Sequence, residues 1–224
     1  MNIRLVRKFT EAGNVVSFIF KPEQAIEWEA GQYLTLTIPD MPPVNNERTF
    51  TISSAPYEKN IQITTRITES QFKQRLNKLE VGEVVEADQF GGDFVWEDRD
   101  EPMIFIAGGI GITPFHSMLK QREHENKQMP VILLYALRDA EIPFKAEFDR
   151  LAAAHPELHI HYLVGERLNT ENIQKFIPQI KQSYVYLSGP EPMVDALEES
   201  LAELGVSKNH LKQDWFPGYT EKSY

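Results

Sequence analysis

The stretch of sequence that decides the fold is MIFIAGGIGITPFHSMLKQREHE, residues 103–125. It begins with an apolar run, passes through Gly108, Gly109 and Gly111, and continues into a helix-like segment that starts near Thr113 and Pro114. Proline suits the first turn of a helix, because the N–H that it lacks has no partner there. An apolar strand, a glycine turn and a helix in this order form the building unit of an α/β sheet.

The same unit recurs three times along the rest of the chain. VILLYAL (131–137) leads into PFKAEFDRLAAAH (143–155), and LHIHYLV (158–164) leads into NTENIQKFI (169–177). YVYLSG (184–189) leads into PEPMVDALEESLAELG (190–205), in which Gly205 is a suitable C-terminal cap. Continuous apolar strands that alternate with helices predict a doubly wound parallel sheet for this half of the chain.

The N-terminal half has a different rhythm. Its short β-rich segments are separated by turn residues such as Ala12-Gly13-Asn14, and they read NIRLVRKF, VVSFIFKP, QYLTLTIP, RTFTISS, NIQITTRI and EVVEADQF. Regularly spaced strands of this kind predict an antiparallel barrel or sandwich. In SQFKQRLNKL (70–79), Phe72, Leu76 and Leu79 recur at helical spacing after a possible capping Ser70. The charged run EDRDE (97–101) marks a boundary, so we expect domains at 1–98 and 99–224.

Composition narrows the class of protein. Of the 224 residues 42% are hydrophobic, which is enough for a sizeable core, and the net charge of −10 disfavours binding to nucleic acid or to anionic membranes. The chain has no cysteine, which excludes disulfides and cysteine-ligated iron–sulfur clusters. No apolar stretch approaches the length of a membrane span, so we expect the cytosol as compartment. The six histidines show no ligand spacing, and we expect no metal site.

RTFTISSAP (48–56) contains the first chemical pattern. Strand alternation sends Arg48 and Phe50 to one face and Thr49 and Thr51 to the other. A guanidinium matches a phosphate, an aromatic ring can cover a flat conjugated ring, and a hydroxyl can donate to a ring nitrogen. These groups could hold a flavin, although from the chemistry alone an ordinary β-strand with one surface arginine is the better explanation.

Two further patterns lie in the C-terminal half. Glycines between a strand and a helix allow a diphosphate to approach the backbone at the helix N-terminus, but a simple tight turn would look the same. The pattern differs from the G-x-G-x-x-G dinucleotide fingerprint. YLSGPEPM (186–193) lies at the carboxyl end of a strand, where open α/β sheets bind ligands. Its alternative reading is a strand-to-helix turn with a proline at the helix start.

Taken together, RTFTISSAP, AGGIGITPF and YLSGPEPM resemble, in the same order, the motifs of the ferredoxin–NADP reductase superfamily. TTRITESQFKQRL also resembles the second flavin element of the family, with Ser70 matching and Ile67 at the position of the usual glycine. The resemblance covers essentially the whole chain. It implies a compact stand-alone oxidoreductase without an iron–sulfur domain, in which a Greek-key-like FAD-binding β-barrel precedes an NAD(P)-binding α/β domain.

For the flavin, the resemblance implies that Arg48 contacts the pyrophosphate, that Phe50 packs on the isoalloxazine or ribityl group, and that the Thr51 hydroxyl lies near flavin N5. Phe50 replaces the usual tyrosine, so a hydrogen bond made by that tyrosine is in doubt. FAD is expected rather than FMN. The expected flavin set is completed by Thr49, Thr64, Arg66 and Ser70.

For the dinucleotide, the resemblance places Ser188 at the position of the family's cysteine, beside nicotinamide C4 and flavin N5. In DWFPGY (214–219), Phe216 is expected nearest the flavin ring, with Trp215 and Tyr219 beside it, although a terminal strand anchored by aromatic residues is the alternative. Thr51, Ser188 and Phe216 are therefore the expected catalytic residues. The expected dinucleotide set is Gly108, Gly109, Gly111, Thr113, Pro114, Arg138, Gly189, Pro190 and Met193.

The donor and the acceptor are less well defined. Glu166 would repel the 2′-phosphate of NADPH, whereas Arg138 or Arg167 would attract it, and we favour NADH while keeping NADPH open. The acceptor is expected to be a separate redox protein, such as a ferredoxin, or a small molecule. A flavin- and nucleotide-binding module that senses redox state or docks on a larger complex, with little turnover, is the alternative function.

Overall fold

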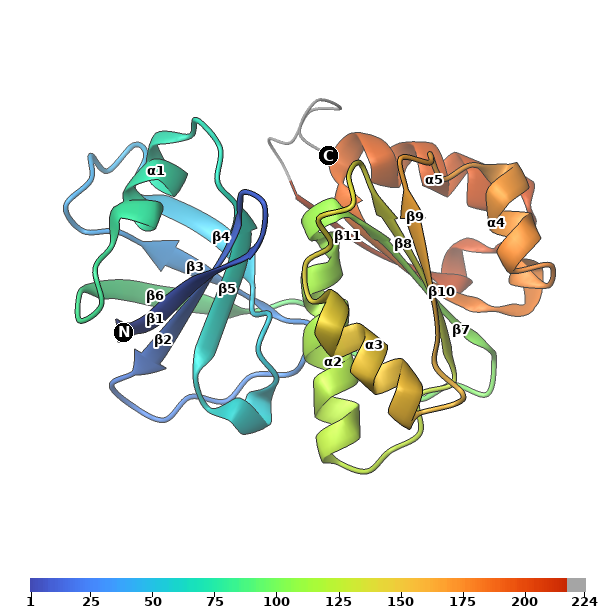
Figure 1. The fold of residues 1–224 in the computed structure, drawn as a ribbon, viewed down its shortest axis with the longest axis horizontal. Coiled ribbons are helices and arrows are strands. Elements are labelled where there is room, and N and C mark those ends of the chain that lie inside the picture. The colour runs from blue at the N-terminus through green and yellow to red at the C-terminus, as the bar shows by residue number, and fades with distance from the viewer. Residues whose placement is uncertain (217–224) are drawn as a thin grey trace. The chain divides into compact units, whose positions relative to one another are not determined.

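The computed structural model describes residues 1–216, which form two compact units (Figure 1). Unit 1 contains Met1–Trp96 together with Thr113–Asn126, and unit 2 contains Glu97–Ile112 together with the chain from Lys127 onward. Residues 113–126 follow the first strand of unit 2 in the sequence but pack with unit 1. The domain boundary expected at 98/99 stays a prediction.

Unit 1 is built on a six-stranded antiparallel sheet. Its strands are β1 (Asn2–Ala12), β2 (Val15–Pro22), β3 (Tyr33–Thr37), β4 (Glu47–Thr51), β5 (Ile61–Arg66) and β6 (Val84–Gly91). Their order in the sheet is β4-β3-β6-β1-β2-β5. A single bridge between Ile52 and Ile63 links the two edges, so the sheet is barrel-like without being closed. This confirms the predicted antiparallel barrel and its Greek-key-like order.

The core of unit 1 is apolar and is covered by a helix. Inward residues of the strands, such as Leu5, Phe18 and Leu34, are fully buried together with Phe72 and Leu76 from α1 (Gln71–Lys78). The 3–4 residue spacing of these helix residues places them on one face, as the sequence predicted. The unit also includes the short helix η1 (Pro56–Glu58) and the helix α2 (Thr113–His124).

Unit 2 is a five-stranded parallel sheet. Its strands are β7 (Met103–Gly108), β8 (Val131–Leu137), β9 (His159–Val164), β10 (Tyr184–Pro190) and β11 (Leu211–Phe216), in the order β11-β10-β7-β8-β9. The helices of this unit are η2 (Gly109–Ile112), α3 (Lys145–Ala154), α4 (Thr170–Phe176), η3 (Ile180–Gln182), α5 (Glu191–Glu203) and η4 (Lys208–His210). The doubly wound sheet is confirmed. β11 is the terminal strand that the sequence left as an alternative.

Both faces of this sheet are covered. On one face Ile104, Leu134 and Leu187 pack with residues of α4 and α5. The helix α3 lies on the opposite face (Figure 1). There Tyr135 packs edge-on against Phe148 of α3, with ring centroids 6.4 Å apart. Burial on both faces explains why these strands read as continuous apolar runs.

The helix ends of unit 2 follow the expected chemistry. Asn169 caps α4 by accepting a hydrogen bond from the Asn172 amide at 2.9 Å. Gly205 has φ of +85° after α5, and the Val206 amide donates back to the Leu201 carbonyl at 3.0 Å. Gly205 is thus the predicted C-terminal cap. None of the helices in residues 1–216 is long and apolar enough to cross a membrane.

Candidate functional site

The flavin candidates on β4 meet α1 around one aromatic ring. The Arg48 guanidinium lies over the Phe72 ring, 5.7 Å from its centroid, and the Phe50 and Phe72 ring centroids are 5.9 Å apart. Arg48 and Phe50 therefore share a face, as alternation predicted. Arg48 is exposed, whereas only 9% of Phe50 is exposed, so Phe50 belongs to the core and offers little ring surface for stacking.

The N-terminus of α1 is suited to an anion. Ser70 occupies the N-cap position, but its side chain makes no capping hydrogen bond. The free N–H groups of a first helical turn and the helix dipole both favour a phosphate. Arg48 contacts Phe72, the second residue of this helix, so a guanidinium and a helix N-terminus lie on neighbouring elements. These residues fit the pyrophosphate of a flavin dinucleotide.

The predicted hydroxyl groups have different surroundings. Thr51 is buried at the end of β4, and the Thr49 hydroxyl lies 3.3 Å from that of Thr35. The Thr64 hydroxyl lies within 3.1 Å of Ser17 Oγ, Ser53 Oγ and Gln62 Nε2. Three protein partners saturate this hydroxyl, so any flavin contact at this position would come from its backbone.

Arg66, at the end of β5, donates to Asn14 Oδ1 at 2.6 Å. Asn14 belongs to the turn between β1 and β2, and its amide nitrogen donates to the Ile67 carbonyl at 3.2 Å. Arg66 therefore ties two segments of unit 1 together, and its predicted role in flavin binding stays a prediction.

Two residues of α2, which the sequence analysis did not single out, contact the segment that follows β4. His116 Nδ1 lies 2.7 Å from the Ser53 carbonyl, and the Ser117 hydroxyl donates to the Ser54 carbonyl at 2.6 Å. Burial lowers the pKa of His116 to about 4. The signal in the sequence was a histidine and a serine on the buried face of a predicted helix, and it did not indicate their partners.

Thr113 and Pro114, the last predicted residues of the second motif, begin α2. They therefore belong to unit 1, whereas Gly108, Gly109 and Gly111 belong to unit 2. The motif that looked continuous in the sequence spans the point at which the chain passes from one unit to the other.

In unit 2 the second and third motifs lie against each other. A Cβ atom added to Gly111 would lie 2.2 Å from the Ser188 carbonyl oxygen, and one added to Gly108 would lie 2.1 Å from the Met193 sulfur. Gly189 has more room, because a Cβ there would lie 3.2 Å from the Met193 sulfur and 3.4 Å from the Gly108 Cα. The close approach of the turn to the backbone of β10 thus requires a glycine at position 111.

The order of the strands explains this juxtaposition. From β7 the sheet proceeds to β8 and β9 on one side and to β10 on the other, so the direction of winding reverses between β7 and β10. Ser188 pairs with Ala107 in register at this point. A crevice at the carboxyl ends of strands where the winding reverses is where open α/β sheets bind ligands.

A pocket of about 360 Å³ lies at this end of the sheet. Gly108, Gly109 and Met193 line it together with the charged side chains of Arg138, Glu166 and Arg167. All three charged residues that the sequence suggested for coenzyme selection therefore share one pocket. It belongs entirely to unit 2.

Ser188 is fully buried and donates to Asp214 Oδ2 at 3.3 Å. Asp214 lies on β11, directly opposite Ser188 in register, and sequence reasoning missed it. Phe216 pairs with Pro190 and is half-buried, whereas 52% of Trp215 is exposed. Tyr219 lies outside the described residues.

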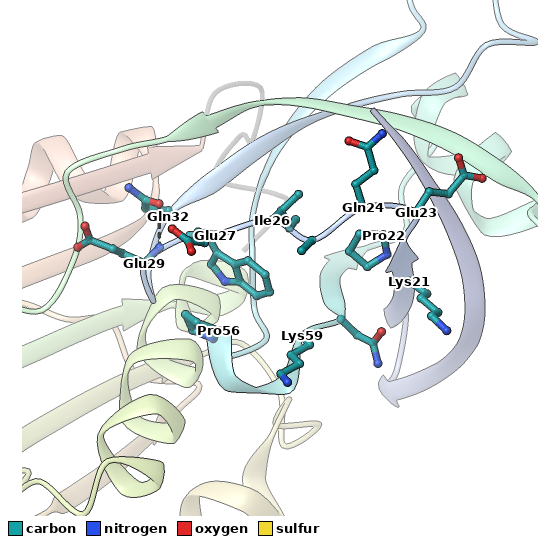
Figure 2. Close-up of a pocket in the computed structure, with 13 residues that line it drawn as sticks. Lys21, Pro22, Glu23, Gln24, Ile26, Glu27, Glu29, Gln32, Pro56 and Lys59 are labelled. Carbon is teal, nitrogen blue, oxygen red and sulfur yellow. Dashed lines mark hydrogen bonds between the residues drawn. The ribbon is translucent and has the colours of Figure 1, made fainter.

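A larger pocket, of about 900 Å³, lies on unit 1 between the end of β2, the loop that follows it, and η1 (Figure 2). Lys21, Glu23, Glu27 and Lys59 give it mixed charge. None of the predicted site residues lines it, so size alone does not locate the chemistry in this protein. In residues 1–216 no group of three or more His, Asp or Glu side chains is arranged to hold a metal ion.

Comparison with known proteins shows which folds and sequences this chain is similar to. Residues 105–199 match the oxidoreductase NAD-binding domain family. The flavohem-like FAD/NAD-binding domain of a Vibrio cholerae nitric oxide dioxygenase shares the fold, with a TM-score of 0.83 and 23% identity over 96% of this chain and 98% of that one. The chain therefore has the fold of this FAD/NAD-binding domain and of ferredoxin–NADP reductases.

Further proteins are similar to this chain in fold or in sequence. A ferredoxin–NADP⁺ reductase from Neisseria gonorrhoeae, solved with bound FAD and NADP, has a TM-score of 0.82 and 16% identity over 96% of this chain and 97% of that one. The flavohemoprotein of Pseudomonas putida is 27% identical over 95% of this chain. This chain spans 58% of the length of that flavohemoprotein.

Proposed function

We propose that this chain is an NAD(P)H-dependent flavoprotein reductase, in which unit 1 binds FAD and unit 2 binds the nicotinamide dinucleotide. The observation that carries the proposal is the approach of the Gly108–Gly111 turn to Ser188 and Met193 where the winding of the sheet reverses. This crevice lies in the stretch that matches the NAD-binding family. Bound FAD would supply the redox chemistry, accepting hydride and releasing electrons to an acceptor.

Unit 1 would bind the flavin through charge and backbone. Arg48 would contact the pyrophosphate, assisted by the N–H groups at the start of α1 and by the Ser70 hydroxyl. Thr51 would present its hydroxyl to the reactive edge of the ring. Phe50 would support the Arg48 side of the site through Phe72.

Unit 2 would bind and orient the dinucleotide. The turn at Gly108–Gly111 would face the diphosphate, and Ser188, held by Asp214, would position the nicotinamide. Phe216 would cover the flavin ring until the nicotinamide displaces the phenylalanine. A serine suffices at position 188, because hydride transfer requires no thiolate.

We propose NADH as the preferred donor. Glu166 lines the same pocket as Arg138 and Arg167, and a carboxylate there suits a ribose hydroxyl and repels a 2′-phosphate. The two arginines offset part of that repulsion, so NADPH is expected to react more slowly rather than not at all.

We propose a protein-bound haem as a second candidate acceptor beside ferredoxin-like proteins. The alignments with the flavohemoproteins of Pseudomonas putida and Dictyostelium discoideum cover 95% and 94% of this chain. They cover 58% of the length of each flavohemoprotein. Reduction of a ferric globin and of a [2Fe–2S] ferredoxin, each at equal concentration, would distinguish the two classes.

The decisive experiment is anaerobic mixing of the FAD-loaded protein with NADH or NADPH while the flavin absorbance is followed. Rapid bleaching with NADH, and slower bleaching with NADPH, is the expected result. If the chain binds FAD but neither coenzyme bleaches it faster than free flavin, the redox-sensing or docking module is the better description. If it binds no flavin, both functions are wrong.

A further inference from the structure

A ladder of side chains joins α2 to the segment that follows the flavin strand within unit 1. His116 and Ser117 contact the carbonyls of Ser53 and Ser54, and Gln121 accepts from the Tyr57 amide at 3.2 Å. Further along, Lys120 donates to Glu58 at 2.7 Å, and the rings of His124 and Tyr57 stack with centroids 4.1 Å apart. The helix therefore follows residues 53–58 from His116 to His124.

Ser53, at the start of this ladder, is bound on every polar atom. Its amide donates to the Gln62 carbonyl at 2.8 Å, and its hydroxyl lies 2.9 Å from that of Thr64. These two contacts fix it to β5, and the contact of its carbonyl with His116 fixes it to α2. Ser53 is separated from Thr51 by a single residue, so the end of β4 is anchored from two sides.

We propose that His116 is a positioning residue of the flavin site, which sets the place of the Thr51 hydroxyl by holding the Ser53 carbonyl. This inference rests on the proposed function. His116 would touch neither cofactor nor substrate. It would act through the backbone, because a shift at Ser53 would move the C-terminal end of β4, which carries Thr51.

The chemistry of His116 suits a permanent structural contact. A carbonyl can only accept, so His116 donates from Nδ1. Burial lowers the pKa of His116 to about 4, with Lys120 acting in the same direction and the Ser53 carbonyl and Glu58 opposing it. The ring is therefore neutral at physiological pH and can hold the same tautomer throughout turnover.

His116→Asn and His116→Gln form the matched test. An asparagine amide can place its N–H near the position of Nδ1, whereas a glutamine amide reaches toward the position of Nε2. His116→Leu removes the donor altogether, and Leu119→Ala, on the same helix and fully buried, controls for loss of packing. The measurements are the Kd for FAD, the visible spectrum of the bound flavin, and kcat and KM with NADH.

We expect His116→Leu and His116→Gln to weaken FAD binding by about tenfold, to alter the flavin spectrum and to lower kcat with little change in the KM for NADH. His116→Asn should restore at least half of each loss, and Leu119→Ala should lower the melting temperature without changing the spectrum.

Equal behaviour of the Asn and Gln variants, or a spectrum that only Leu119→Ala changes, would overturn the inference. If His116→Leu fails to fold, the Asn and Gln pair still decides. Failure of the wild-type protein to bind FAD would instead overturn the proposed function, so the two failures can be distinguished.

Discussion

The hydrogen bond between Ser188 and Asp214 is the feature of the proposed site that involves the fewest residues. The Ser188 hydroxyl donates to Asp214 across adjacent strands, which fixes its direction in a fully buried position. We predict that Ser188→Ala lowers kcat for flavin reduction by about tenfold, the size of one lost hydrogen bond at the reacting group. Stopped-flow absorbance with NADH measures this, and the Kd for FAD should not change.

Ser188→Cys is the control for that prediction, since it keeps a small side chain with a weaker donor. It should retain more activity than the alanine variant. An alanine variant as fast as the wild type would mean that Ser188 serves only the packing of the turn against β10.

Glu166 is the residue on which coenzyme choice is expected to depend. Replacing it by glutamine removes the charge that opposes a 2′-phosphate in the pocket shared with Arg138. We predict that Glu166→Gln raises kcat/KM with NADPH by roughly fivefold, an effect of the size expected for a solvent-exposed charge pair. Steady-state kinetics with both coenzymes measure the change.

Glu171→Gln removes a charge on α4, outside the residues that line this pocket, and serves as the matched control. If both variants change the NADPH rate equally, the effect comes from net charge and not from the pocket. A wild-type enzyme that prefers NADPH would contradict the assignment of Glu166.

At the scale of elements, the glycine turn after β7 determines how closely three segments of unit 2 pack. A Cβ at Gly111 would meet the Ser188 backbone at 2.2 Å, whereas a Cβ at Gly108 would meet the end of the flexible Met193 side chain. We predict that Gly111→Ala lowers the free energy of unfolding by about 3 kcal/mol and abolishes NADH binding. Gly108→Ala should lower the free energy of unfolding by less than Gly111→Ala does, because the Met193 side chain can move.

Gly91→Ala provides the reference for this pair. It lies on β6 of unit 1, and an added Cβ there meets nothing within 4 Å. Its free energy of unfolding should stay within about 1 kcal/mol of the wild type. Thermal or urea unfolding of the three variants checks the order, and equal stability of Gly111→Ala and Gly91→Ala would contradict the observed approach.

At the scale of the whole molecule, His116 is expected to make stability depend on pH. Its folded-state pKa of about 4 lies below the ordinary value of 6.5, so the unfolded chain binds a proton first as the pH falls. The contribution of His116 to the free energy of unfolding is fully present above pH 6.5. It decreases by about 3 kcal/mol as the pH falls from 6.5 to 4. Carboxylates with lowered pKa, such as Glu83, which accepts hydrogen bonds from the Glu80 amide and from Arg75, add their loss as the pH falls through about 4.5.

Urea unfolding between pH 4.5 and 7.5 measures this dependence. In the His116→Asn variant the free energy of unfolding should fall much less between pH 6.5 and 4.5 than in the wild type, since asparagine does not titrate. An identical slope in the variant and the wild type would assign the dependence to other groups.

The chain also crosses between the two units more often than its sequence suggests. It passes from unit 1 to unit 2 after Trp96, returns at Thr113 and leaves again after Asn126. The alternation of strand and helix predicted α2 at the right place along the chain, and in the structure this helix belongs to unit 1. Periodicity reports which face of a helix is apolar and not which partner covers that face.

The sequence by itself determined the type and order of the elements, because burial on both faces makes a strand continuously apolar and helix ends need particular residues such as Asn169 and Gly205. It also determined the three motifs and their resemblance to those of the ferredoxin–NADP reductase superfamily. The tertiary structure alone decided that Gly111 lies against Ser188, that Asp214 holds Ser188, and that His116 holds Ser53. These contacts join residues 26 to 77 positions apart in the chain, and their distances depend on strand order and helix packing, which no local pattern encodes.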